Sequence, residues 1–198
     1  MFFSGARPAR LTLAGVFALA LATTGYAADV EKASITVEGE AYAYEFVATL
    51  NAPAAEVLNV ITDFDALKRL NDHIVDSRIL ARPADGPFKR LLRIERCILS
   101  FCFDLIFVEY VEQREMSVTT TIEPDGSTFH AGTSIWAVAA LEDGSTRLSV
   151  NASQTPDFWI PPVIGELVLE RVFLSEMEET AKRIEVLANT PAIPAVVP

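Results

Sequence analysis

Residues 162–188 read PVIGELVLERVFLSEMEETAKRIEVLA, and this stretch decides the fold of the chain. Its apolar residues recur at the three- and four-residue spacing of one helix face. They are Ile164, Leu167, Val168, Val172, Leu174, Met177, Ala181, Ile184 and Leu187. On the other face, Glu178 and Glu179 each stand four residues before a cation, a spacing that supports a solvated helix. The pattern predicts one amphipathic helix, roughly 40 Å long at the α-helical rise.

The segments before this helix alternate apolar and polar residues, as half-buried strands do. Strands are expected over residues 35–50, 74–81, 88–98, 102–112, 116–122, 128–141 and 147–155. Gly39 is expected to mark a bulge or bend in the first strand. Two short helices are expected next, one opening with Pro53 and one capped by Asp63. This order predicts an α+β domain in which a curved antiparallel sheet of about seven strands grips the terminal helix.

Residues 1–27 have the pattern of a secretory signal peptide, with Arg7, Arg10, an apolar run over 11–22 and small residues before Ala27. The run is shorter than the roughly 20 residues that a bilayer requires, so we expect cleavage and no membrane anchor. Losing two arginines and no acid changes the formal charge from -11 to -13. Such a surface repels phosphate backbones, so no nucleic-acid partner is expected. The expected location is periplasmic or secreted.

The chain after the leader has the length of one domain, expected over residues 28–190. Residues 191–198, which include Pro191 and Pro194, are expected to form a flexible tail. Cys97 and Cys102, the two cysteines, lie at the ends of a short predicted hairpin loop, and export permits a disulfide between them. Buried free thiols and a redox pair are the alternatives, and the redox pair is weaker because the spacing is not Cys-x-x-Cys.

Four segments resemble a known superfamily: LNAPAAEV at 50–57, ITDF at 61–64, GTSIW at 132–136 and DGSTRL at 143–148. They are similar to the START-like, or SRPBCC, superfamily, which includes polyketide cyclases, coenzyme-Q-binding proteins, lipid-transfer domains and pollen-allergen-like proteins. The resemblance extends over about residues 34–188 and implies the helix-grip fold, with a deep, mostly apolar cavity between sheet and terminal helix. Its motifs are structural, and the superfamily contains both binders and enzymes.

Apolar residues of the late strands, the hinge and the terminal helix are expected to line this cavity. They are Leu105, Phe107, Phe129, Trp136, Leu148, Val150, Trp159, Ile164 and Val168. Trp159 lies in the aromatic and proline hinge at residues 158–162, where gating of a ligand and plain packing are equally favoured.

Three polar residues are weak catalytic candidates. His130 is expected on the same strand face as Trp136, because the two are an even number of residues apart. Glu109 lies among apolar strand residues, and Arg96 is its expected partner, although a surface ion pair explains these two equally well. No histidine stands at a metal-ligand spacing, so neither a metal nor a cofactor is expected.

The leading hypothesis is a carrier that holds a hydrophobic small molecule, such as a lipid, a quinone or a polyketide-like compound, in the cavity. The alternative is a cyclase, aromatase or dehydratase acting in the same cavity. A third interpretation is an interaction module that uses the strand at 103–111, which is apolar on both faces. The sequence assigns neither one ligand nor an oligomeric state.

Overall fold

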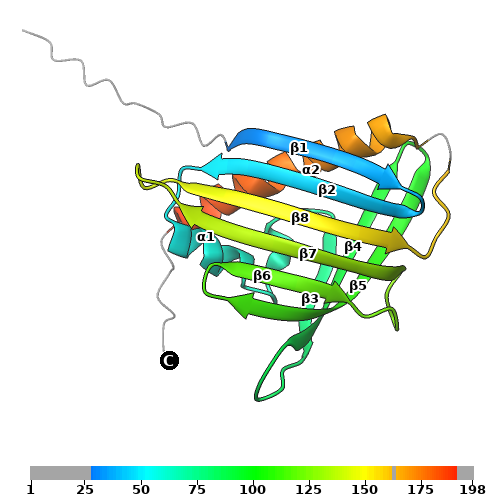
Figure 1. Cartoon of the computed structure of the whole chain (residues 1–198), viewed down its shortest axis with the longest axis horizontal. Coiled ribbons are helices and arrows are strands. Elements are labelled where there is room, and N and C mark those ends of the chain that lie inside the picture. The colour runs from blue at the N-terminus through cyan, green and yellow to red at the C-terminus, as the bar shows by residue number, and fades with distance from the viewer. Residues whose placement is uncertain (1–27, 162–163, 191–198) are drawn as a thin grey trace, which may run out of the picture.

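The computed structural model describes residues 28–161 and 164–190, so the expected signal peptide at 1–27 and the expected tail at 191–198 lie outside the described residues. Figure 1 shows a curved sheet folded around one long helix. In chain order the elements are β1 (Asp29–Glu38), β2 (Ala41–Leu50), α1 (Ala54–Ile61), η1 (Leu67–Arg69), β3 (Ile74–Ala81), β4 (Phe88–Ile98), β5 (Phe101–Arg114), β6 (Ser117–Ile122), β7 (Phe129–Ala140), β8 (Thr146–Pro156) and α2 (Glu166–Ala188).

The strands form one antiparallel sheet in the order β1-β2-β8-β7-β6-β5-β4-β3. Strand β2 lies next to the β1 edge of the sheet, and β3 forms the opposite edge. The connection between these two strands contains α1 and η1. The prediction of an α+β helix-grip fold, with two short helices and a long terminal helix, is confirmed.

The sheet has eight strands in the described residues, where the sequence predicted about seven. The difference arises at Gly39, which was expected to bulge one long strand and instead turns the chain back on itself. Its φ of 64° is a conformation that glycine adopts without a steric penalty. Glu38 therefore pairs with Ala41, and the segment divides into β1 and β2.

Helix α2 begins at Glu166, four residues later than predicted. Residues 162 and 163 are not described, but Ile164 already donates its backbone N–H to the carbonyl of Pro161 in a turn. Gly165, the residue before the helix, is extended, with φ -75° and ψ 174°, so the helical conformation begins only at Glu166. The end at Ala188 agrees with the prediction. None of the described helices has the length and apolar character of a membrane span.

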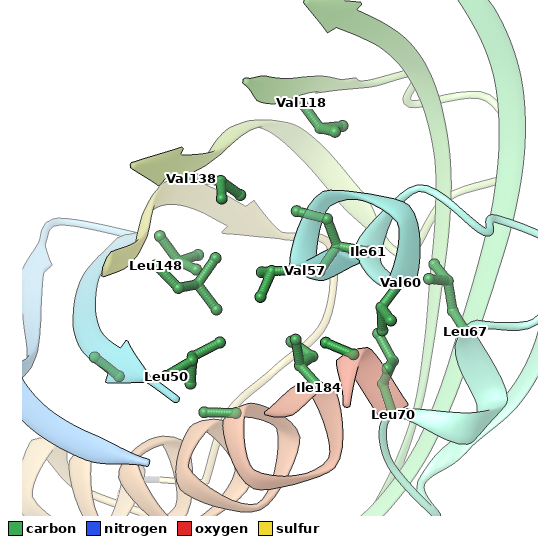
Figure 2. Close-up of a cluster of buried hydrophobic side chains, with 14 of the residues drawn as sticks. Leu50, Val57, Val60, Ile61, Leu67, Leu70, Val118, Val138, Leu148 and Ile184 are labelled. Carbon is green, nitrogen blue, oxygen red and sulfur yellow. The ribbon is translucent and has the colours of Figure 1, made fainter. Parts of the chain in front are cut away.

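The main core lies where α1 packs between the sheet and the C-terminal half of α2. Figure 2 shows Val57 of α1 pointing toward Leu148 of the sheet, with Ile184 of α2 beside them. All three side chains are fully buried. A smaller cluster of Phe107, Ile122 and Phe129 lies elsewhere in the sheet. The concave face between these clusters is not filled by side chains, which leaves space for the cavity.

Candidate functional site

A cavity of about 400 Å³ lies between the concave face of the sheet and α2. Its size falls within the roughly 300–1,000 Å³ of small-molecule sites. Most of its lining is aliphatic or aromatic, and the rings include Tyr44, Phe64, Phe103, Phe158 and Phe173. An apolar wall of this kind excludes water and favours an apolar molecule of matching size.

Five of the nine residues expected at the cavity border it. They are Leu105, Phe107, Phe129, Trp136 and Val150. Their contact with a ligand stays a prediction. Leu148 is not among the lining residues, because its buried side chain is part of the core around α1. Ile164 is also buried, but it lies outside the lining.

Trp159 and Val168 were also expected at the cavity, and neither lines it. Trp159 is 71% exposed, while Phe158 and Ile160 on either side of it face the cavity. On α2 the cavity face carries Leu169, Val172, Phe173, Glu176, Met177 and Thr180. Val172 and Met177 belong to the predicted apolar stripe, whereas the polar Glu176 and Thr180 do not, so the stripe coincides with the cavity face only in part.

Arg90 and Glu109 form a buried ion pair in the cavity wall. Arg90 donates from Nε and Nη2 to Oε2 of Glu109, at 2.9 and 2.8 Å. The other oxygen of Glu109 accepts a hydrogen bond of 2.8 Å from Thr120, whose hydroxyl also lies 2.9 Å from that of Ser134. Buried charges need such partners, since desolvation otherwise destabilises the fold. The prediction that Arg96 pairs with Glu109 is wrong.

The register of the β4–β5 hairpin explains why Arg90 is the partner. Cys97 lies opposite Cys102, and each step back along β4 matches one step forward along β5. Seven such steps place Arg90 opposite Glu109. The same count places Arg96 opposite Phe103. Counting from the two cysteines would therefore have identified this pair from the sequence.

Tyr44 of β2 adds a second polar group to the cavity wall, and sequence reasoning did not propose it as a site residue. Its ring packs against Phe173 of α2, with ring centroids 5.0 Å apart. Burial, together with the negative charge of Glu109, raises the pKa of Tyr44 above its ordinary value. The phenol therefore stays protonated and is a hydrogen-bond donor. Its hydroxyl has no hydrogen-bond partner within residues 28–161 and 164–190.

Arg96 lies at the cavity margin in a polar cluster that joins the sheet to α2. Its Nη2 is 2.9 Å from Oε1 of Glu176, and its guanidinium also contacts the imidazole of His73. Asn71 donates to the other oxygen of Glu176 at 2.8 Å. Asn71, His73, Arg96 and Glu176 also line a polar hollow of about 310 Å³ beside the cavity. The apolar cavity thus borders a polar surface on this side.

Next to this cluster, both Nη atoms of Arg183 donate to the two oxygens of Asp72, at 2.7 and 2.6 Å. These hydrogen bonds hold the pKa of Asp72 below its ordinary value. Glu179, one turn before Arg183 on α2, accepts a further hydrogen bond from it. The pairing attaches the loop between η1 and β3 to α2 at the cavity margin.

His130 lies outside the cavity, so the prediction that it shares the cavity face with Trp136 is wrong. Its Nε2 is 2.8 Å from Asp157, and both side chains are more than half exposed. The pairing of β7 with β8 shifts register between Phe129 and Ala131, and this irregularity breaks the strict alternation on which the prediction relied. No cluster of three or more metal-ligating side chains is found among the described residues.

The predicted disulfide between Cys97 and Cys102 is confirmed. It joins directly opposed residues near the turn of the β4–β5 hairpin. Ile98 and Phe103, which flank the bridge, line the cavity. The disulfide therefore constrains one wall of the candidate site.

Both apolar faces of the strand at 103–111 have contacts inside the domain. Phe103, Leu105 and Phe107 line the cavity. Val108 is buried, and its backbone exchanges hydrogen bonds with the loop at residues 123–127. Tyr110 on the second face is 41% exposed, so this face is covered only in part, and the interaction module stays a prediction.

Residues 35–188 match the model of a family described as polyketide cyclase / dehydrase and lipid transport. A search of curated proteins found no match.

Several solved structures share the fold. A START superfamily protein from Mycobacterium smegmatis is 22% identical, with a TM-score of 0.56 over 73% of this chain and 94% of that chain. The Zhui aromatase/cyclase from Streptomyces sp. R1128 is 12% identical, with a TM-score of 0.58 over 75% and 93%. A STAR-related lipid transfer protein from Xanthomonas axonopodis is 14% identical, with a TM-score of 0.55 over 77% and 98%. At these identities the likeness concerns the fold alone.

Proposed function

Because this chain belongs to the polyketide cyclase / dehydrase and lipid transport family, we propose that it binds and carries a hydrophobic small molecule between the sheet and α2. The apolar cavity of about 400 Å³ is the observation that carries the proposal. A carrier needs to shield an apolar molecule from water, and it needs no reactive group. The names of the structural neighbours, which include a lipid transfer protein and an aromatase/cyclase, support a ligand of this chemical kind.

The polar groups of the wall narrow the ligand to a molecule with an apolar body and an oxygen acceptor. Tyr44 has a protonated hydroxyl that faces the cavity without a partner in the described chain. Arg90 also borders the cavity and directs two of its nitrogens toward Glu109. A ligand carbonyl or hydroxyl oxygen would accept a hydrogen bond from Tyr44. Lipids, quinones and polyketide-like aromatics carry such oxygens.

We also propose that the protein acts in the periplasm or outside the cell. Two observations support this location. The leader at residues 1–27 has the pattern of a signal peptide. The Cys97–Cys102 disulfide is a bond that persists in oxidising compartments.

Native mass spectrometry of the purified protein, followed by extraction and lipid analysis, tests the carrier. The variant Ile94→Trp is expected to weaken binding of the molecule, because Ile94 lines the cavity and the larger indole narrows it. The control Ile135→Trp is expected to keep the molecule, since Ile135 is 46% exposed and does not line the cavity. A protein that binds none of the lipids, quinones and polyketide-like aromatics offered to it would overturn the proposal.

A cyclase, aromatase or dehydratase remains the second candidate, because Glu109 and Arg96 both border the cavity. Against it, both oxygens of Glu109 already accept hydrogen bonds, and Arg96 pairs with Glu176 instead of Glu109. Incubation with polyketide-like aromatic precursors and mass analysis distinguishes the two functions. A carrier returns the compound unchanged, whereas a dehydratase returns one lighter by a molecule of water and loses this activity in Glu109→Gln.

A further inference from the structure

Three large apolar side chains project into solvent more than any others in the described chain. Leu99 is 67% exposed, Trp159 71% and Leu167 82%, and the other exposed large apolar residues reach at most 46%. We call these three residues the apolar rim. Single exposed apolar residues are ordinary on a protein surface, but three of this size at one end of a cavity are not.

The rim residues come from three segments that meet at one end of the cavity. Leu99 lies in the β4–β5 turn, Trp159 before α2, and Leu167 in the first turn of α2. Figure 1 shows the β4–β5 turn, the segment after β8 and the start of α2 at the same end of the molecule. A ring contact of 5.6 Å between Phe103 of β5 and Phe158 joins two of these segments.

Each rim residue stands beside a residue that lines the cavity. Ile98 precedes Leu99, Phe158 and Ile160 flank Trp159, and Leu169 follows two residues after Leu167. The apolar lining therefore approaches the protein surface at the rim. An apolar ligand leaving here would meet the rim side chains before bulk water.

Leu99 has a backbone conformation that its side chain disfavours. Its φ is 56°, and it is the one non-glycine residue with a positive φ among those described. Glycine or asparagine adopts this conformation at lower cost. A leucine here is unfavourable for the backbone and, at 67% exposure, gains little burial within the domain. An apolar surrounding outside the domain would make this residue favourable.

We propose that the apolar rim inserts into the interfacial layer of a zwitterionic lipid bilayer, so that the cavity faces the membrane. This inference goes beyond ligand carriage, because it assigns a surface and a partner. Separate side chains on three segments fit a deformable lipid layer better than a preformed protein pocket, and tryptophan is favoured at membrane interfaces. The net charge of -11, with Glu166 and Glu170 beside Leu167, opposes anionic lipid, so a zwitterionic surface is the matching one.

The fluorescence of Trp159 measures insertion of the apolar rim into the bilayer. The chain has two tryptophans, and the other, Trp136, lines the cavity, so Trp136→Phe leaves Trp159 as the single tryptophan, which can be excited selectively over the tyrosines. With phosphatidylcholine vesicles we expect a blue shift of Trp159 emission and quenching by brominated chains. Vesicles containing phosphatidylglycerol are expected to bind less at low salt. The leader at residues 1–27 contains no tryptophan, so the emission reports the surroundings of Trp159 and not those of the leader.

Variants measure the contribution of each side chain in co-sedimentation with phosphatidylcholine vesicles. We expect about a tenfold loss of partitioning for each of Leu99→Ser, Trp159→Ser and Leu167→Ser, as apolar burial of this size implies. The matched control combines Leu80→Ser, Ile135→Ser and Val186→Ser, which are exposed outside the rim, and it should partition as the parent does. Leu99→Gly should unfold at a higher urea concentration, because glycine adopts the positive φ without a steric penalty. The same variant should bind vesicles less, because it lacks the apolar side chain. If Leu99 served only the stability of the fold, vesicle binding would not fall while stability rose.

Unchanged Trp159 emission, or equal partitioning of the rim and control variants, would overturn the proposal. Capture of a purified protein partner by the rim, with no response to vesicles, would also overturn it. A fluorescent fatty acid that binds in the cavity separates this inference from ligand carriage. Binding of the fatty acid without insertion of Trp159 would overturn the membrane proposal and leave the carrier proposal standing. Insertion of Trp159 without fatty-acid binding would support the membrane proposal and count against the carrier.

Discussion

Arg90 and Glu109 lie opposite each other on β4 and β5. Both are buried, so each charge needs the other to neutralise it. Their side chains are 8% and 4% exposed, so a charge that loses its partner there is poorly hydrated. Cross-strand pairing brings them together, which a reading of each strand by itself does not detect. The pair supplies charge inside a wall that is otherwise mostly apolar.

Replacing Glu109 with alanine is expected to destabilise the fold by about 3–5 kcal/mol, because it leaves the guanidinium of Arg90 buried and unpaired. The matched control is Glu112→Ala, which breaks an exposed pair with Arg114. That change should cost less than about 1 kcal/mol. Urea unfolding measures both, and equal losses would contradict the burial argument.

Because the pKa of Tyr44 is raised in the folded state, the free energy of unfolding is expected to fall at alkaline pH. Burial and Glu109 raise its pKa in the folded state, so the folded protein retains a proton that the unfolded chain releases near about pH 10. This stabilisation is complete below about pH 10 and is lost progressively as pH rises further. Tyr44→Phe should therefore lose less stability than the parent between about pH 9 and pH 11. The urea midpoint across this range measures it, and identical slopes in the two proteins would count against the assignment.

At the scale of elements, single residues decided where strands and helices begin and end. The positive φ of Gly39 converts one predicted strand into the β1–β2 hairpin. The irregular pairing after Phe129 turns His130 away from the face that Trp136 shares with the cavity. The alternation of apolar and polar residues does not reveal the turn at Gly39 or the register shift after Phe129. Both depend on how one strand pairs with its neighbour.

The β4–β5 hairpin is the element that the disulfide constrains. The double variant Cys97→Ser, Cys102→Ser is expected to lose about 2 kcal/mol, since the loop that the bridge closes is short. The loss should appear as a lower urea midpoint, with at most a small rise in the slope because the loop is short. Dithiothreitol should lower the midpoint of the parent protein and leave that of the variant as it is. A variant as stable as the oxidised parent would show that strand pairing alone holds the hairpin.

At the scale of the whole molecule, the fold encloses space where most domains place side chains. The main core lies at α1, and the second cluster surrounds Phe107, so the cavity replaces a continuous core beneath α2. A protein built in this way gains stability when an apolar molecule fills the space.

A bound hydrophobic ligand is expected to stabilise the fold by about 2.7 kcal/mol at a free concentration one hundred times its Kd. Ile94→Trp should show a smaller gain, because the larger indole narrows the cavity, whereas Ile135→Trp should respond as the parent does. Urea midpoints with and without a fatty acid measure the response. A gain retained in full in Ile94→Trp would mean that the ligand binds elsewhere.

By itself, the sequence predicted the fold class and the disulfide, because strand alternation, helix periodicity and cysteine spacing are local properties of the chain. The family resemblance implied the cavity, which five of the nine residues expected there border. The tertiary structure decided which face of α2 meets the cavity. It also decided that Trp159 points into solvent while its two neighbours line the wall. These outcomes depend on register and on the angle at which α2 crosses the sheet. Both arise from packing between segments far apart in the chain, which no local pattern encodes.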